Sequence, residues 1–193
     1  MDLAQQLKNF RPDSAQEKAD RYYILGRLSD GPVLYTRESE DAHITVSAWV
    51  ISRDGSQVLM AWHNIYQSWA WLGGHADGDT DLMAVAVREV EEESGLTALE
   101  PLCRDFISLE VLPVAAHVRR GKPVPAHLHL NFTYLFRADE TKTIRIKPDE
   151  NSKVGWIPAD QVCDYSTEPL FQTVIYPKLL RKTEKILHTE EPL

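Results

Sequence analysis

The sequence has little of what several specialised classes of protein require. Cys103 and Cys163 are its two cysteines among 193 residues, which is too few for a disulfide framework, and their spacing matches no zinc motif. We therefore expect two buried thiols. No apolar run reaches the roughly 18 residues of a membrane-spanning helix, and the first ten residues lack the basic and then apolar layout of a secretory signal. These features favour a cytoplasmic protein that does not associate with membranes.

Basic residues are also scarce. Lysine and arginine number 21 against 29 aspartates and glutamates, which gives a formal net charge of −8. The sequence has no basic stripe that could neutralise a phosphate backbone, so we expect no general binding of nucleic acids. Small phosphate esters stay open, because a bound metal can supply positive charge locally. The hydrophobic content of 43% suits a chain with one sizeable core.

The residues most informative about chemistry lie between Gly74 and Leu96. Four glutamates occupy positions 89 and 91–93, directly after Arg88. Asp79 or Thr80 can cap a helix that Gly95 ends in a left-handed conformation, so we predict a helix from about Thr80 to Ser94. Helical spacing places three of the glutamates on one stripe beside an apolar stripe. The acidic stripe consists of Glu89, Glu92 and Glu93, and the apolar stripe of Met83, Ala86, Val87 and Val90.

Three carboxylates so close together repel one another, and on the helix Arg88, four residues before Glu92, offsets this only in part. A hard divalent cation such as Mg²⁺ prefers oxygen ligands and often binds carboxylates together with substrate phosphates. The alternative interpretation is a solvated acidic face, which is the usual role of a charge run on a helix.

The segment resembles the Nudix box, whose pattern is Gly, five residues, Glu, seven residues, and then Arg-Glu-apolar-any-Glu-Glu-any-Gly-apolar. One position departs, because Thr80 stands where the pattern has its first glutamate. That glutamate mainly supports the loop and helix in the family. So long a pattern at fixed spacing is much more specific than a lone glycine-rich loop. The matching residues are Gly74, Arg88, Glu89, Val90, Glu92, Glu93, Gly95 and Leu96.

The resemblance implies a fold and a reaction. The fold would be an α/β/α sandwich, a Nudix-like mixed sheet between the box helix and a C-terminal helix. The reaction would be hydrolysis of a diphosphate bond in a nucleoside diphosphate linked to another moiety, with Mg²⁺ or Mn²⁺ as cofactor. Glu89 and Glu93 would be metal ligands, Glu92 a ligand or the base, and Gly73 would offer its carbonyl. Arg88 would orient the acidic cluster.

Hydrophobic periodicity divides the rest of the chain. Residues 1–40 read as a helical extension and residues 41–193 as the Nudix-like domain. The extension covers one side of the domain or forms a homodimer contact, and the pattern does not decide between them. Alternation predicts strands from His43, at Val58–Trp62, Trp69–Leu72 and Phe106–Val114, from His127 to Tyr134, and at Val154–Ile157. Apolar spacing from Glu168 onward predicts a helix that Pro177 kinks or restarts.

Two segments after the box are candidates for binding substrate. A proline-punctuated loop at residues 117–122 contains Arg119, which either reaches a substrate phosphate or is merely solvated. In the strand that follows, His127 and His129 share a face, which is either a solvent-facing edge or a cleft wall that donates hydrogen bonds. We group both histidines and Arg119 with His75 of the box as predicted substrate contacts.

In many similar proteins an acidic residue before the tryptophan-containing strand reaches the metal, and Glu150 is the candidate here. The alternative is an ordinary surface glutamate. No side signature identifies the substrate, so a small nucleotide-type diphosphate is the predicted partner. The competing function is a catalytically inactive Nudix-fold module that binds a nucleotide or regulates a partner. Thr80 gives this alternative weight, and the intact glutamate set counts against it.

Overall fold

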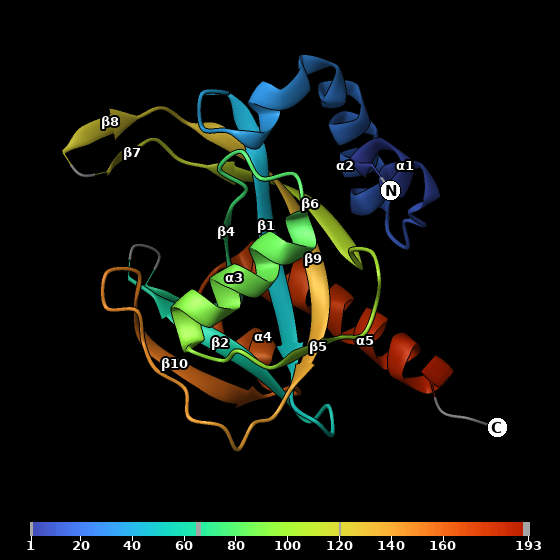
Figure 1. Ribbon diagram of the computed structural model, residues 1–193, viewed down its shortest axis with the longest axis vertical. Coiled ribbons are helices and arrows are strands. Elements are labelled where there is room, and N and C mark those ends of the chain that lie inside the picture. The colour runs from blue at the N-terminus through green and yellow to red at the C-terminus, as the bar shows by residue number, and fades with distance from the viewer. Residues whose placement is uncertain (1, 65–66, 120, 191–193) are drawn as a thin grey trace.

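The protein is a mixed sheet covered by helices on both faces, as the computed structural model shows (Figure 1). The structure describes residues 2–64, 67–119 and 121–190. The central strand β1 (Ala42–Ile51) runs parallel to β9 (His127–Ala138) over its whole length. The remaining strand pairs are antiparallel, so the predicted mixed sheet is confirmed. The other sheet strands are β2 (Gln57–His63), β3 (Ser68–Ala70), β4 (Leu72–His75), β5 (Leu99–Pro101), β6 (Ser108–Val114) and β10 (Asn151–Pro158).

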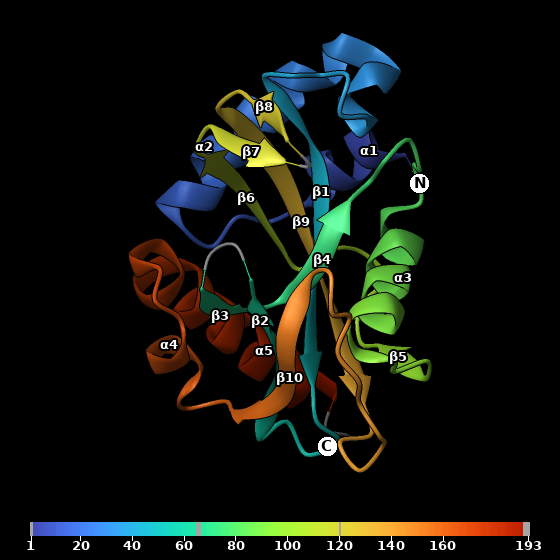
Figure 2. The same ribbon diagram turned by 90° about the vertical axis from the view of Figure 1, so that its left-hand side faces the viewer.

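The two faces of β1 bury different side chains, which creates the layers. Ile44, Val46 and Val50 join a core with the buried side of α3 (Leu82–Ser94). On the opposite face, Trp49 joins a second core with α5 (Tyr176–Glu190). Figure 2 shows α3 on one side of the sheet and α4 (Val162–Tyr165) with α5 on the other. The predicted sandwich is therefore confirmed, and it leaves the outer stripe of α3 available for chemistry.

Several boundaries differ from the sequence expectations. α3 begins at Leu82, because Asp81 caps it by accepting a hydrogen bond from the Ala84 N–H. Asp79 instead accepts from the Asp81 N–H in the preceding turn. The predicted strand at Trp69–Leu72 divides at Trp71 into β3, which pairs with β2, and β4, which pairs with β1. A single extended run thus crosses between two partner strands, and this brings Gly73 and Gly74 beside β1.

The segment expected as an irregular loop at residues 117–122 is a hairpin. β7 (His117–Arg119) pairs with β8 (Lys122–Val124). Gly121 adopts a φ of 76°, which a glycine tolerates in a tight turn. Strand pairing forms here despite the prolines. Pro123 pairs with Val118, and the missing N–H of proline is tolerated because both strands of this isolated ribbon are edge strands.

The N-terminal residues form α1 (Leu3–Asn9), α2 (Ala15–Arg27) and a 3₁₀ segment η1 (Leu28–Tyr35). Ser14 caps α2 by accepting from the Glu17 N–H. Leu7 and Ile24 are buried in the same core as α3. These helices cover the side of the domain where β6 and α5 meet (Figure 1).

At the C-terminus, a π-helical turn η2 (Phe171–Ile175) precedes α5. Pro177, the second residue of α5, has no N–H to donate, and the wide turn before it fits that gap in the ladder. Cys103 and Cys163 are half-buried, so they are more exposed than expected. Within the described residues, the helices are too short or too polar to cross a membrane.

Candidate functional site

The site is built where α3 passes β4. The Gly73 N–H donates a hydrogen bond to Glu93 Oε2 at 3.1 Å. A side chain at Gly73 would collide with the carbonyl of Val46 on β1, so only glycine allows this close approach of three segments. Glu93 is 8% exposed. The packing therefore fixes one carboxylate of the acidic stripe against the backbone of β4.

Gly74 serves the neighbouring glutamate. A Cβ at Gly74 would lie 2.5 Å from the carboxyl carbon of Glu89, so the missing side chain is the space that the Glu89 carboxylate occupies. The double glycine thus has two separate purposes, one against the backbone of β1 and one against a functional side chain.

Burial raises the pKa of both carboxyls. It raises the pKa of Glu93 to about 8, with Glu89 and Glu150 adding to the shift and the Gly73 hydrogen bond opposing it. Burial also raises the pKa of Glu89 to about 7, with Glu92 and Glu150 adding to the shift. The protein therefore holds negative charge here at a free-energy cost, which a bound cation would remove.

One lysine lies among these acids. Lys147 Nζ lies 2.7 Å from Glu92 Oε2 and 3.1 Å from Glu150 Oε2. Glu150 therefore lies close to the acidic face of α3, and its role at a metal stays a prediction. Asn151 is buried and donates to the carbonyl of Glu93 at 3.1 Å while accepting from the Lys147 N–H. It fastens the loop before β10 to the end of α3.

Arg88 does not pair with Glu92, the acid four residues further along the helix. It lies 3.4 Å from Asp79 Oδ2, and both side chains are exposed. Glu92 is held instead by Lys147 from the loop before β10. Arg88 therefore offsets the acidic stripe only through its charge, which lowers the pKa of Glu89, while Lys147 pairs directly with Glu92. Arg88 joins the helix to the turn that precedes it.

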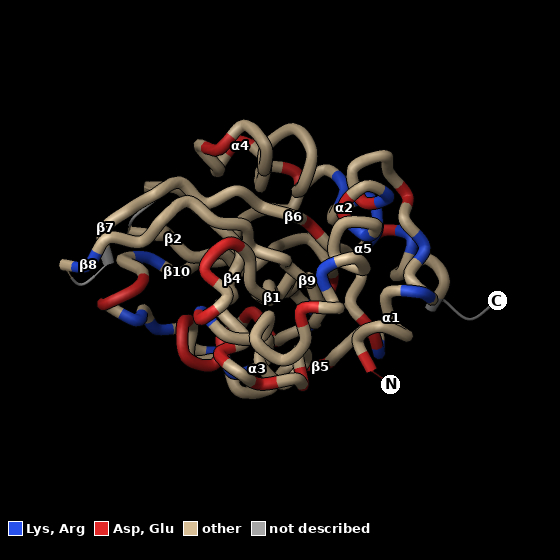
Figure 3. The backbone as a smooth tube through the Cα atoms, turned by 90° about the horizontal axis from the view of Figure 1, so that it is seen from above, with Lys and Arg blue, Asp and Glu red and all other residues tan. Residues whose placement is uncertain are grey.

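These residues fit a hard divalent cation. The donors are carboxylate oxygens, and the set carries more negative charge than Lys147 offsets. Its two least exposed members, Glu89 and Glu93, have raised pKa values. Oxygen-only sets of this kind suit Mg²⁺ or Mn²⁺. Figure 3 shows the acidic residues gathered along α3 and the adjoining loop.

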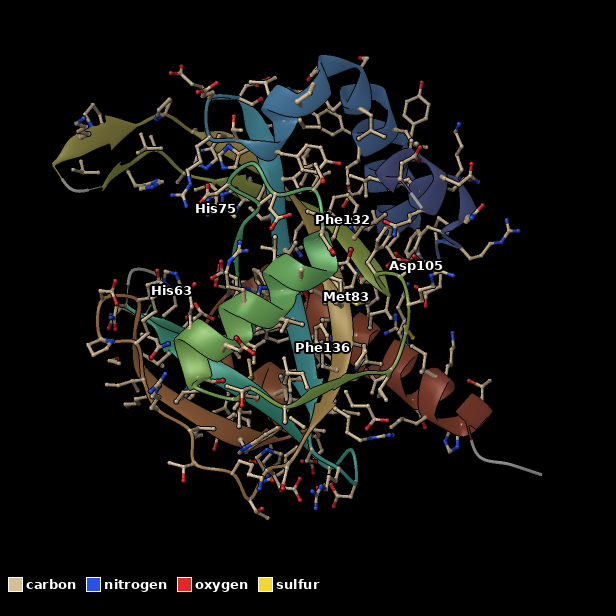
Figure 4. The ribbon with its side chains drawn as sticks, viewed as in Figure 1. His63, His75, Met83, Asp105, Phe132 and Phe136 are labelled. Atoms are coloured by element: carbon tan, nitrogen blue, oxygen red, sulfur yellow. The ribbon has the colours of Figure 1, made fainter. Side chains whose placement is uncertain are left out.

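Four histidines gather beyond the other end of β4. His43 and His129 are direct partners in the β1–β9 register, and His75 is two residues past Gly73. Their ring centroids lie 4.9 to 5.2 Å apart, and His127 stacks on His43 at 4.8 Å. His127 is 8% exposed, so the alternative of a solvent-facing edge is wrong at that position. Figure 4 shows His75 near the base of the β7–β8 hairpin, well apart from His63.

Burial keeps the inner rings neutral. It lowers the pKa of His75 to about 3, with Arg37 and His43 adding to the shift. It lowers the pKa of His129 to about 2, with His75 and His43 adding to the shift. Beside the rings, Arg37 forms a two-point ion pair with Asp77 at 2.7 and 2.8 Å. Neutral imidazoles can donate or accept hydrogen bonds, or bind metals.

The basic hairpin is only partly described. Arg119 ends β7, but its side chain and the whole of Arg120 lie outside the described residues. His117, at the start of the same strand, lies 6.0 Å from His127 between ring centroids. The hairpin therefore adjoins the histidines.

Sequence reasoning missed three members of these groups. Lys147 and Asn151 carry no local signal for this role, because the residues of α3 that they contact are more than 50 positions away. His43 was assigned only to a strand face. Its alternation with Thr45 and Ser47 did place it on a polar face, and the pairing of β1 with β9 was needed to bring that face to His129.

Comparison with known proteins agrees with this geometry. The family model described as the NUDIX domain matches residues 41–179. No curated protein sequence matches the chain. Among solved structures, the NUDIX domain of Shewanella oneidensis NrtR complexed with ADP ribose has a TM-score of 0.52 at 16% identity, covering 97% of this chain and 99% of its own.

Two further structures show the same fold. The C. elegans Ap4A hydrolase has a TM-score of 0.51 at 16% identity and covers 76% of this chain and 98% of its own. The E. coli dihydroneopterin triphosphate pyrophosphohydrolase has a TM-score of 0.51 at 16% identity, covering 69% and 92%. The family model spans well over half of the chain and includes the acidic stripe of α3. The protein therefore belongs to the NUDIX family.

Proposed function

We propose that the protein hydrolyses the diphosphate bond of a nucleoside diphosphate linked to another moiety, using Mg²⁺ or Mn²⁺. The observation that carries this proposal is the pair formed by Glu89, which is half-buried against Gly74, and Glu93, which is buried against Gly73, both with raised pKa values. Such a set has no structural purpose that an apolar residue would not serve better. NUDIX family membership supports the same reaction class.

Glu89, Glu92, Glu93 and the carbonyl of Gly73 would hold the cation, with Glu150 near enough to contribute. When bound, the cation would stabilise the negative charge on the diphosphate and lower the pKa of a water bound to it. The chain's own part is positional. The Gly73 N–H positions the Glu93 carboxylate, and Asn151 positions the loop that carries Glu150. Lys147 forms an ion pair with Glu92, which would act as a metal ligand or as the general base. Arg88 steadies the turn before the helix through Asp79.

The substrate would extend toward the histidines. The rings of His75, His127 and His129 would form hydrogen bonds with the substrate, and Arg119 on the hairpin would add positive charge for a phosphate. The substrate class is a small nucleotide-type diphosphate. ADP-ribose and dinucleoside polyphosphates enter as test compounds because the similar folds include a domain complexed with ADP ribose and an Ap4A hydrolase.

A panel of diphosphate compounds tests the proposal. The full chain is assayed for phosphate or nucleotide release with Mg²⁺, with Mn²⁺ and with excess chelator. We expect turnover of at least one compound that the chelator abolishes and that Glu93→Gln reduces strongly. Metal-independent turnover, or equal turnover by Glu93→Gln, contradicts the proposal.

The competing function is a binding module without catalysis, which Thr80 in place of the box glutamate favours. Calorimetric titration of the panel distinguishes the two functions. A pure binding module shows saturable heat with no metal-dependent product, whereas the hydrolase produces both. A cytoplasmic location, a possible homodimer and the separate standing of residues 1–40 stay predictions from the sequence.

A further inference from the structure

Three histidines converge from three adjacent strands of the sheet. β1 lies between β4 and β9, and its His43 is in register with His129, while His75 on β4 lies opposite Thr45. One ring nitrogen from each of the three histidines can be chosen so that all three nitrogens lie within 4.8 Å of one another. Their backbone positions are set by sheet pairing rather than by a flexible loop. This placement is separate from the carboxylates on α3.

His43 is oriented for a partner that the described residues do not provide. Its Nδ1–H donates to the carbonyl of Ser39 at 3.1 Å, which leaves a lone pair on Nε2. That nitrogen is buried without a hydrogen-bond partner, and the residue is only 5% exposed. An unsatisfied buried acceptor is costly. A carbonyl bound to one ring nitrogen is the usual arrangement behind a histidine that binds metal through the other.

His127 gives His129 a similar orientation. The His127 Nδ1–H donates to the carbonyl of Pro125 at 2.9 Å. Its Nε2 lies 3.2 Å from Nε2 of His129, and with Nε2 of His127 as the acceptor, Nε2 of His129 donates. The hydrogen bond leaves Nδ1 of His129 with its lone pair. Two of the three rings are thus held from behind by fixed hydrogen bonds, which is preorganisation for a ligand set.

The chemistry of the set selects a class of ion. Neutral imidazole nitrogens suit Zn²⁺, Co²⁺ and Ni²⁺, whereas Mg²⁺ prefers oxygen. A tetrahedral ion bound at about 2.0–2.1 Å keeps its nitrogens roughly 3.3 Å apart, so small ring rotations close the set from within its 4.8 Å spacing. The neighbouring Arg37 is neutralised by Asp77. Three protein ligands leave one coordination position open.

We propose that His43, His75 and His129 form a second metal site that binds one transition-metal ion of the Zn²⁺ class, with its open position available to a water or a phosphate oxygen. This site is distinct from the Mg²⁺ or Mn²⁺ site on α3. It does not depend on the proposed hydrolysis, because it is defined by ion binding to the chain alone.

The test is a titration of the full chain with Co²⁺ and Zn²⁺ after treatment with chelator. Co²⁺ bound by histidines in four-coordinate geometry absorbs visible light, and Zn²⁺ then displaces it, which gives a readout without turnover. We expect one Co²⁺ per chain with this four-coordinate absorption, recorded in excess Mg²⁺ so that the carboxylates on α3 are occupied. His75→Asn and His129→Asn are the test variants because both rings are half-buried, and each should weaken binding at least tenfold. Circular dichroism and thermal melting verify that both variants fold.

Two controls locate the ion. His188→Asn changes an exposed histidine on α5 and should bind Co²⁺ as the wild type does, as should Glu93→Gln. Absence of Co²⁺ binding to the wild type at micromolar concentrations overturns the proposal. Folded His75→Asn or His129→Asn that binds normally does the same, and so does loss of the Co²⁺ spectrum in Glu93→Gln, which would place the ion on the carboxylates.

Discussion

Two groups of glutamates in this molecule differ in the charge that surrounds them. Glu17 and Glu110 are 0% and 1% exposed, and Lys178 and Lys182 of α5 reach them at 2.8 Å. Lys178 lies 3.5 Å from Glu17 as well, so it ties α2, β6 and α5 together. The glutamates on α3 have only Lys147, which contacts Glu92 and Glu150 and leaves Glu89 and Glu93 without a salt-bridge partner among the described residues.

The difference separates structure from chemistry. A buried glutamate with a lysine beside it is satisfied by the chain itself and gains nothing from a solute. Glutamates that are shielded from solvent and have too little cationic charge beside them have raised pKa values, and an external cation can stabilise their charged form. Glu93 is nearly as buried as Glu17 and Glu110, so at this residue the missing counter-charge, rather than burial, identifies the functional group.

The largest effect should come from breaking the lysine-paired group. Lys178→Met removes the charge that lies between Glu17 and Glu110 and leaves two buried carboxylates partly uncompensated. We expect the free energy of unfolding to fall by about 3–5 kcal/mol, measured by urea denaturation. Lys185→Met, an exposed lysine on the same helix, is the matched control and should change stability by less than about 0.5 kcal/mol. Equal stability of the two variants would falsify the structural role of the buried pair.

The glutamates on α3 should respond in the opposite way. Glu93→Gln deletes an anionic ligand but keeps an oxygen that can accept from the Gly73 N–H. We expect kcat to fall by about 10² or more, with stability in metal-free buffer unchanged or slightly higher because repulsion is relieved. Glu91→Gln, on the other side of the helix, is the control and should retain activity. Activity of Glu93→Gln within a few fold of wild type rules it out as a metal ligand.

Gly74→Ala sharpens the comparison without changing any charge. The new Cβ would lie 2.5 Å from the Glu89 carboxyl carbon, so the side chain must move. We expect about a tenfold loss of kcat/KM, equal to about 1.4 kcal/mol, and a small change in melting temperature. Gly26→Ala is the control, because nothing lies within 4 Å of its added Cβ. A fully active Gly74→Ala would show that the position of Glu89 is not critical.

The stability of the protein in chelator should also depend on pH. The folded pKa values of Glu89 and Glu93 are about 7 and about 8, above the ordinary 4.5, so the folded state binds more protons. The free energy of unfolding should therefore fall as the pH rises from about 5 to about 8. Glu93→Gln should flatten this slope and added Mg²⁺ should reduce it, as urea denaturation across that range can measure. A slope unchanged in Glu93→Gln means that another group titrates.

The histidines should make stability depend on pH in the opposite direction, in an acid limb of the stability curve below pH 6.5. The folded pKa values of His75 and His129 are about 3 and about 2, below the ordinary 6.5. Their contribution to stability is present above pH 6.5 and is lost as the pH falls below it. His129→Asn should therefore weaken the acid limb and leave the alkaline limb in place. Urea denaturation between pH 4.5 and pH 6.5 checks this, and an unchanged acid limb would contradict the assignment.

Local patterns determined much of this protein from the sequence alone. The spacing of Glu89, Glu92 and Glu93 follows from helical geometry, Gly95 ends α3 with a φ of 76° as expected, and the alternation along β1 separates its two faces. These are interactions within a few residues, where periodicity and capping leave few alternatives. The family follows from the same short segment.

Only the tertiary structure decided which distant groups meet. Lys147 and Glu92 are 55 positions apart, and Lys178 and Glu110 are 68 positions apart. Likewise, His43 meets His129 only because β1 and β9 pair in parallel at that register. No local preference encodes such pairings, since they depend on how whole strands and helices pack. The lysines that pair with these glutamates come from other helices and loops. The sequence could therefore identify the glutamates, but not which of them lack a lysine partner and can bind a cation.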